Sequence, residues 1–250
     1  MNRLLRKAAD SILFGPSRFA EPMQKAVQFV LRGPKEAEIV FSGGPAAGRK
    51  FHCLTSEKIF FLGDGYEADL IRPIQEVLRP GMTAYDVGAH TGYWTIVFAE
   101  LCGERGRVFA FEPCPSNRAR LLGNVELNKL SNVSVVGAAV SDRDGVSQLH
   151  EEGSMSTVGS SGIRIETVSL DLFCLSNPFA DFLLIDIEGH AGQALKGARR
   201  MLSSRRPPCI CELHDAAEQK CVQEELARHG YSSCHLDGDK FPLHILATSR

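Results

Sequence analysis

Residues 85–94 read YDVGAHTGYW, a pattern that predicts a strand, a turn on glycines and the start of a helix. Glycines let a backbone approach a ligand without a Cβ clash, and a helix start offers free N–H donors. Asp86 ends this strand, and a second acid, Glu112, follows the next strand-like run, Arg107–Phe111. An acid in that second place can accept hydrogen bonds from both hydroxyls of a ribose. The stretch therefore predicts a pocket for a nucleoside-bearing ligand.

Two cofactors fit such a pocket, namely a dinucleotide and S-adenosylmethionine. The dinucleotide fingerprint is G-x-G-x-x-G, whereas this chain has D-x-G-x-x-x-G beginning at Asp86. An acid in that position repels a pyrophosphate but attracts the cationic sulfonium end of S-adenosylmethionine. The pattern favours S-adenosylmethionine. An NAD-dependent oxidoreductase is the alternative, and an ordinary tight turn would explain the glycines but not both acids.

The composition is that of a globular protein. Of its 250 residues, 44% are hydrophobic, and 28 basic residues nearly balance 30 acidic ones. We therefore expect no basic face for nucleic acid and no membrane-spanning segment. The eight cysteines include no C-x-x-C pair, which argues against structural zinc. A divalent metal could bind the acids and histidines of residues 186–214, but they form no tight ligand motif, and we predict no metal. A chain of this length without an export signal indicates a reduced, cytoplasmic protein.

The first part of the chain differs in pattern from the rest. Residues 1–80 predict a lead-in with helices at Arg3–Phe14 and Pro22–Leu31, followed by short strands. Residues 81–250 alternate between strand-like and helix-like segments, which predicts one domain with an open, mostly parallel sheet and helices on both faces. The apolar run Phe182–Ile187 is typical of a central parallel strand buried on both faces.

Two features interrupt this alternation. The segments Tyr231–Leu236 and His244–Thr248 leave no room for a helix between them, so they must be antiparallel if they are neighbours. Between the predicted third strand, Val133–Val140, and the central strand, the segments Val146–His150 and Ile163–Val168 predict a hairpin. Its small, polar tip at residues 153–162 predicts either a surface loop or a lid over the substrate.

Several blocks now occur in a fixed order. They are YDVGAHTGYWTIVFA at 85–99, FAFEPCPSNRARLLGNVELN at 109–128, VSLDLF at 168–173, DFLLIDIEGHAGQALKGARRML at 181–202 and PCICELH at 208–214. This set resembles the FkbM family of S-adenosylmethionine-dependent methyltransferases over about residues 60–215. The resemblance implies the class I methyltransferase fold, a Rossmann-like, seven-stranded, mostly parallel α/β sheet with its last strand reversed. It also implies methyl transfer to a hydroxyl group of a sugar, polyketide or similar small metabolite.

The resemblance implies a set of cofactor-binding residues. They are Asp86, Gly88, Ala89, His90, Gly92, Glu112, Pro113, Asn117 and Asp142. Glu112 would hold the ribose hydroxyls, Asn117 would cap or anchor the helix after it, and Asp142 would lie near the adenine. We expect Gly88→Val to abolish cofactor binding and to leave the fold mostly intact, since the added side chain would occupy the ligand's space.

A second set would serve the acceptor. It consists of Asp186, Glu188, His190, Glu212 and His214, which follow strands whose carboxyl ends meet at one edge of the sheet. A hydroxyl acceptor must lose a proton, and His190 or His214 is the expected base. The family usually has a lysine at the place of Leu184 and an acid at that of Ala191. A cofactor-binding protein without catalytic activity is therefore a further alternative.

Overall fold

The computed structural model describes residues 36–54, 57, 61, 67–152, 155–159 and 162–249. The helices predicted in the first 35 residues lie outside them. The chain divides into two compact units, Met1–Ala68 and Asp69–Arg250. In the described part of the first unit, β1 (Glu36–Val40) and β2 (Lys50–Leu54) pair antiparallel. This pair agrees with the short strands predicted in this region.

The described residues of the second unit form a seven-stranded sheet in the order β12-β13-β11-β10-β3-β4-β5. Its strands are β3 (Thr83–Val87), β4 (Arg107–Phe111), β5 (Val133–Val136), β10 (Phe182–Ile185), β11 (Cys209–Leu213), β12 (Tyr231–His235) and β13 (Leu243–Ser249). The neighbours from β11 to β5 are parallel, whereas β13 runs antiparallel to both β11 and β12. The predicted class I sheet with a reversed last strand is confirmed.

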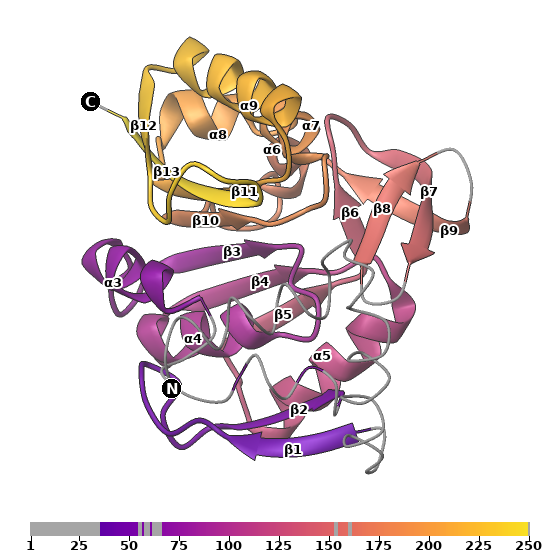
Figure 1. Ribbon diagram of the computed structural model, residues 1–250, viewed down its shortest axis with the longest axis vertical. Coiled ribbons are helices and arrows are strands. Elements are labelled where there is room, and N and C mark those ends of the chain that lie inside the picture. The colour runs from indigo at the N-terminus through magenta and orange to yellow at the C-terminus, as the bar shows by residue number, and fades with distance from the viewer. Residues whose placement is uncertain are drawn as a thin grey trace, which may run out of the picture. The chain divides into compact units, whose positions relative to one another are not determined.

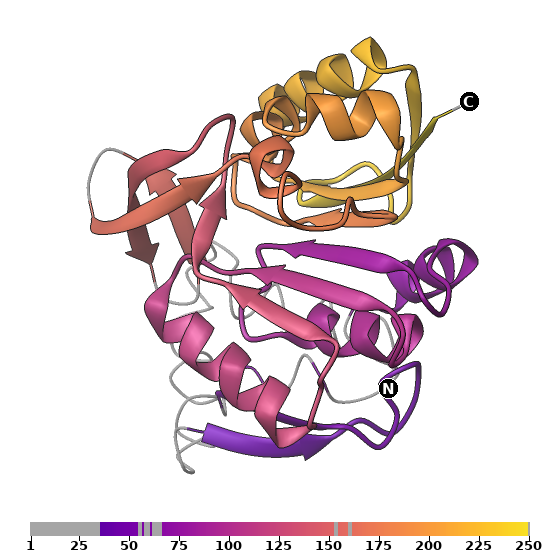
Figure 2. The same cartoon turned by 180° about the vertical axis from the view of Figure 1, so that it is seen from behind.

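Helices cover both faces of this sheet (Figures 1 and 2). They are α3 (Ala68–Val77), α4 (Tyr93–Cys102), α5 (Pro115–Leu127), α6 (Leu170–Phe173), α7 (Ala191–Lys196), α8 (Arg199–Ser204) and α9 (Ala216–Arg228). Leu121 of α5 packs against Ala110 of β4. Phe109 and Phe111 of the same strand belong instead to the core cluster that contains side chains of α6, α7, α8 and α9. Alternate residues of a strand point to opposite faces, so these two groups of helices lie on opposite sides.

The strands at the centre of the sheet are mostly apolar because both of their faces are covered. Every residue of β10 is buried, as is every residue of β3. Asp86 is the acidic exception within β3, while Asp186 comes directly after β10 rather than within the strand predicted at Phe182–Ile187. The acids thus lie where the buried strands reach the sheet edge.

A second sheet follows β5. Within the described residues it contains β6 (Ala138–Val140), β7 (Gly145–Glu152), β8 (Met155–Gly159) and β9 (Ile163–Val168), in the order β6-β9-β7-β8. The antiparallel pairing of β7 with β9 confirms the predicted hairpin. A loop or a lid was predicted at its tip, but part of the tip forms β8, which pairs with the other edge of β7.

The predicted third strand, Val133–Val140, is interrupted at Gly137. A Cβ at this position would lie 3.0 Å from the guanidinium of Arg118. Beyond it, the chain leaves the main sheet and β6 pairs with β9 instead. This change of partner directs the following turn, with Asp142, towards the second sheet.

Candidate active site at the carboxyl ends of the strands

The turn after β3 is held against both neighbouring strands. The N–H groups of Gly88 and Ala89 both donate to the carbonyl of Phe111, each at 3.0 Å. Gly88 has a φ of +91°, and a Cβ there would lie 1.8 Å from the carbonyl oxygen of Asp186. Because the added atom would strike backbone rather than a ligand, the expectation that Gly88→Val leaves the fold intact is wrong.

Packing and backbone conformation also explain why the second position of the turn is a glycine. Gly92 has a φ of +97° and occupies the N-cap position of α4. A Cβ there would lie 2.6 Å from a methyl carbon of Leu121. The glycine thus allows α4 to begin in contact with α5.

Glu112 closes the turn from the side of β4. Its carboxylate is 4% exposed and accepts hydrogen bonds from the N–H groups of His90 and Cys114, both at 2.8 Å. Arg118 holds the same corner by donating to the carbonyls of Glu112 and Pro113. Burial raises the pKa of Glu112 to about 7, and the negative charge of Asp86 adds to the increase.

Asp86 is the more deeply buried of these two acids, at 1% exposure. Its Oδ2 accepts a hydrogen bond from the hydroxyl of Thr95 at 2.5 Å. A buried negative charge is costly unless it is compensated. Two buried acids around one glycine turn therefore suit a cationic ligand that carries hydroxyl groups, and they oppose a pyrophosphate.

The other predicted cofactor residues lie farther along the same edge. Asn117 is buried in the first turn of α5, but Cys114 occupies the N-cap position, so Asn117 is not the capping residue. Asp142 lies in a turn that lines a cavity of about 330 Å³, together with His190 and Gln193. The Nε2 atom of His190 is 3.1 Å from the hydroxyl of Ser141, and burial lowers the pKa of this imidazole.

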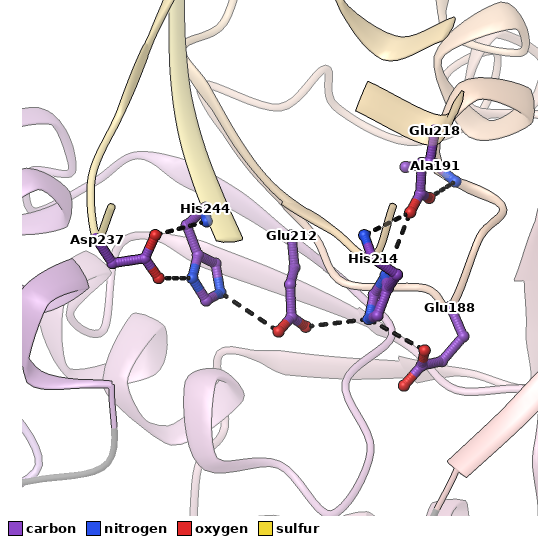
Figure 3. Close-up of polar contacts among 7 residues, drawn as sticks. All are labelled: Glu188, Ala191, Glu212, His214, Glu218, Asp237 and His244. Atoms are coloured by element: carbon purple, nitrogen blue, oxygen red, sulfur yellow. Dashed lines mark hydrogen bonds and ion pairs between the residues drawn. The ribbon is translucent and has the colours of Figure 1, made fainter. Parts of the chain in front are cut away.

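His214 gathers the remaining predicted residues (Figure 3). Its Nε2 atom lies 3.0 Å from Glu188 and 3.6 Å from Glu212. The ligand atoms of Asp186, Glu212 and His214 all lie within 4.8 Å of one another. The structure therefore brings together Asp186, Glu188, Glu212 and His214, while His190 faces Ser141 and the cavity beside Asp142.

The electrostatics of this cluster follow from its excess of carboxylates. Burial acts to lower the pKa of His214, but its hydrogen bond to Glu218 and the charges of nearby acids outweigh that effect and raise the pKa. Burial raises the pKa of Glu188. Groups of this kind can hold a divalent cation, yet acids also gather without one, and we assign no metal here.

Comparison with known proteins decides between the cofactors. The profile of the methyltransferase FkbM domain matches residues 86–236, more than half of the chain. The chain belongs to the FkbM methyltransferase family. The hexuronic acid methyltransferase AglP of Haloferax volcanii is 29% identical over 212 residues, which cover 79% of this chain and 81% of that protein.

Solved structures share the fold of this FkbM methyltransferase. Methyltransferase FkbM from Methylobacillus flagellatus KT matches with a TM-score of 0.52 and 18% identity, covering 70% of this chain but only 50% of that one. An S-adenosylmethionine-dependent O-methyltransferase from Thermotoga maritima matches with a TM-score of 0.52 and 14% identity, covering 89% and 80% of the two chains.

Membership of the FkbM family confirms S-adenosylmethionine as the cofactor, so the dinucleotide alternative is not retained. The buried acids at the glycine turn fit this cofactor better than a pyrophosphate, for the reason given above. Among the described helices of this FkbM methyltransferase, none has the length and apolar character needed to cross a membrane.

Two residues of this FkbM methyltransferase that the sequence did not predict lie beside the candidate site. Glu218 accepts hydrogen bonds from His214, and the pattern D-x-x-E starting at Asp215 is a helix-capping signature that could have drawn attention to it. His244 pairs with Asp237 at 2.6 Å, and its Nε2 atom lies 3.9 Å from Glu212. A histidine in the apolar run at the start of β13 was the only available signal for that pair.

The departures from the usual family pattern lie at buried positions. Leu184 is within β10 and is 2% exposed, and Ala191 is fully buried at the start of α7. The N–H of Ala191 donates to Glu218 at 3.2 Å. In this FkbM methyltransferase, both positions are therefore occupied by apolar side chains of the packed interior.

Proposed function

We propose that this chain transfers a methyl group from S-adenosylmethionine to a hydroxyl group of a small metabolite or sugar. The observation that carries the proposal is the position of His214. A base for the hydroxyl proton lies among carboxylates at the ends of β10 and β11. These strand ends share one sheet edge with the glycine turn after β3, which is where open α/β sheets place their ligands.

The chain's own residues divide the work of binding. Glu112 would accept the ribose hydroxyls, since a carboxylate has acceptor capacity beyond its two backbone donors. Asp86 would favour the cationic part of the cofactor, and Asp142 would contact the adenine. Asp186 follows a rigid, buried strand, so its carboxylate is well placed to orient the reacting groups.

S-adenosylmethionine supplies an electrophilic methyl group, which passes to the acceptor oxygen as the carbon–sulfur bond breaks. The hydroxyl proton must leave as this oxygen forms its new bond, and we assign the proton to Nε2 of His214. His214 is preferred over His190 because it lies beside Glu188 and Glu212, whose negative charges stabilise the imidazolium that forms, whereas His190 faces Ser141. The raised pKa of His214 means that the rate should increase with pH as this imidazole loses its proton.

The direct test is methyl transfer with a labelled cofactor. The full chain is incubated with S-adenosylmethionine carrying a ¹³C-labelled methyl group and with a panel of hydroxyl acceptors. The panel pairs neutral sugars with hexuronic acids, because the relative AglP is a hexuronic acid methyltransferase. Mass spectrometry should detect a labelled methyl ether, and fragmentation gives its position.

Two results would contradict the proposal. One is a methyl group found only on a carboxylate or an amine, which would reject the hydroxyl acceptor. The other is cofactor binding without turnover on any acceptor, which would favour the non-catalytic alternative. His214→Ala serves as the control for non-enzymatic methylation, because it should retain the cofactor site and lose turnover.

A further inference from the structure

Glu218 is a buried carboxylate that contacts two separate parts of the active-site edge. It lies in the first turn of α9 and is 7% exposed. Its Oε2 atom accepts a hydrogen bond from the N–H of His214 at 2.9 Å and lies 3.3 Å from Nδ1 of the same residue. Its Oε1 atom accepts from the N–H of Ala191. One side chain thus joins the segment after β11 to the start of α7 (Figure 3).

Helix capping explains only part of this arrangement. Asp215 is the N-cap residue of α9, and its Oδ1 atom accepts from the N–H of Glu218 at 2.8 Å. In a capping box, the glutamate at the third helical position returns to a backbone N–H near the cap. The contact of Glu218 with the N–H of His214 is of this kind. Its contacts with the imidazole of His214 and with Ala191 go beyond what the helix needs.

The contact with the imidazole determines which ring nitrogen carries the proton. An ionised carboxylate only accepts hydrogen bonds, so the Nδ1 atom of His214 must be the donor to Glu218. The Nε2 atom points away from Glu218 and lies 3.0 Å from Glu188 and 3.6 Å from Glu212, so it also donates while the imidazole carries both protons. When the ring loses one proton, Glu218 remains the ionised acceptor for Nδ1 because its pKa is lowered, whereas the pKa of Glu188 is raised. In the neutral ring, Nε2 then holds the lone pair.

We propose that Glu218 is the positioning residue of this active site. It selects the Nδ1–H tautomer of His214 and keeps Nε2 directed at the acceptor, much as the carboxylate of a Ser-His-Asp triad orients its histidine. Through Ala191, it also holds the segment that carries Glu188. This inference rests on the proposed methyl transfer with His214 as the base.

The charges around His214 agree with this role. The imidazole is faced by Asp186 and Glu188 after β10, by Glu212 of β11 and by Glu218 of α9, with His244 of β13 on the far side of Glu212. Among these acids, Glu218 is in contact with Nδ1. Burial acts to raise the pKa of Glu218, but its hydrogen bonds from His214 lower the pKa overall and keep the side chain an acceptor.

The tautomer can be measured without knowing the acceptor. The full chain is labelled with ¹⁵N-histidine, and its ring nitrogens are observed by NMR at a pH where His214 is neutral. The His214 signals are assigned by their loss in His214→Gln. We expect the wild-type proton on Nδ1. Glu218→Ala should shift the population towards Nε2–H, the form that water favours, and Glu218→Gln should do so less because its amide oxygen can still accept.

Glu225→Gln is the matched control. Glu225 is also a buried glutamate of α9, at 3% exposure, but its partner is Arg199 at 2.6 Å. This variant should lose stability and leave the His214 tautomer unchanged. A wild-type proton on Nε2, or an unchanged tautomer in folded Glu218→Ala, would overturn the proposal. If Glu218→Ala does not fold, the same criterion applies to Glu218→Gln.

A second measurement separates this inference from the proposed function. Calorimetry on the same samples gives the affinity for S-adenosylmethionine, which Glu218→Ala should change by less than about threefold. With an acceptor from the panel above, kcat of this variant should fall by about 10²-fold while KM changes little. If the tautomer depends on Glu218 but no acceptor is methylated, the proposed function fails and the geometric inference stands.

Discussion

At the scale of single residues, the proposed cofactor side of the site contains two buried acids with different surroundings. Asp86 lies within the sheet and accepts from Thr95, whereas Glu112 lies just beyond its strand and accepts from backbone N–H groups. Burial brings the pKa of Glu112 to about 7. Its charge can therefore change within the ordinary range of assay conditions.

Cofactor affinity should depend on pH through Glu112. Ribose hydroxyls donate to the ionised carboxylate, and the ionised fraction increases as pH passes through about 7. The affinity for S-adenosylmethionine should thus be roughly tenfold higher at pH 8 than at pH 6, as expected for a group of that pKa that must be ionised. Titration calorimetry at both pH values measures the ratio.

Substitutions of Glu112 test whether this carboxylate is the group that titrates. Glu112→Ala should weaken S-adenosylmethionine binding by about 1.5–3 kcal/mol, or roughly ten- to a hundred-fold. Glu112→Gln should abolish the pH dependence, because its amide does not titrate. A pH dependence retained in Glu112→Gln would place the titrating group elsewhere.

Substitutions on the acceptor side should reduce turnover more than they reduce cofactor binding. Asp186→Asn keeps the shape of the side chain and removes its charge, so we expect a large fall in kcat with a smaller change in cofactor affinity. His214→Ala should lower the rate by roughly 10²–10⁴-fold, and His190→Ala should lower it less. Steady-state kinetics and calorimetry on the three variants provide the comparison. Full activity in all of them would place the reacting centre elsewhere.

At the scale of elements, close packing explains the glycines better than ligand contact does. The turn at Gly88 touches the backbone after β10, so β3 and β10 are held together at the site. The segment after β10 contains two short helices, α7 and α8. A Cβ at Gly197, between them, would lie 2.0 Å from the carbonyl oxygen of Ser141.

Two glycine substitutions should have opposite effects on stability. Gly88→Ala should cost at least about 2 kcal/mol, since it combines a positive φ with a backbone clash. Gly123 lies in α5, where a Cβ would meet nothing within 4 Å, so Gly123→Ala should stabilise the protein by about 1 kcal/mol. Urea unfolding of both variants measures the difference. Equal stabilities would show that the turn is looser than the structure indicates.

At the scale of the whole molecule, the strand order places the site. The chain builds β3, β4 and β5 outwards in one direction and then returns to add β10 on the other side of β3. Ligands of open α/β sheets bind at the carboxyl ends of the strands where the order reverses in this way. Asp86 and Asp186, one hundred residues apart in the sequence, meet at that point because β3 and β10 are parallel neighbours.

Cofactor binding should therefore stabilise the second unit. A ligand at a hundred times its Kd adds about 2.7 kcal/mol to the free energy of unfolding, which corresponds to roughly 5–10 °C for a domain of this size. Thermal unfolding with S-adenosylmethionine should show this shift. NAD at the same concentration should give none, and an equal shift with NAD would contradict the cofactor assignment.

The sequence by itself determined the fold class and the cofactor, and it placed most of the predicted site residues at one edge of the sheet. Strand and helix periodicity, the spacing D-x-G-x-x-x-G and the acid after the second strand are local signals, because each depends on residues close together along the chain. The same is true of Asp186, Glu188, Glu212 and His214, which directly follow or end apolar strands and therefore had to reach the sheet edge.

Only the tertiary structure decided which of these residues contact one another. The strand β5 ends before Gly137, where a Cβ would lie 3.0 Å from the guanidinium of Arg118, a residue of an earlier helix. His190 faces Ser141 rather than His214, and Glu218 and His244 join the cluster from α9 and β13. These choices depend on contacts between segments far apart in the chain. Local periodicity carries no information about such contacts, because packing and charge compensation act through space.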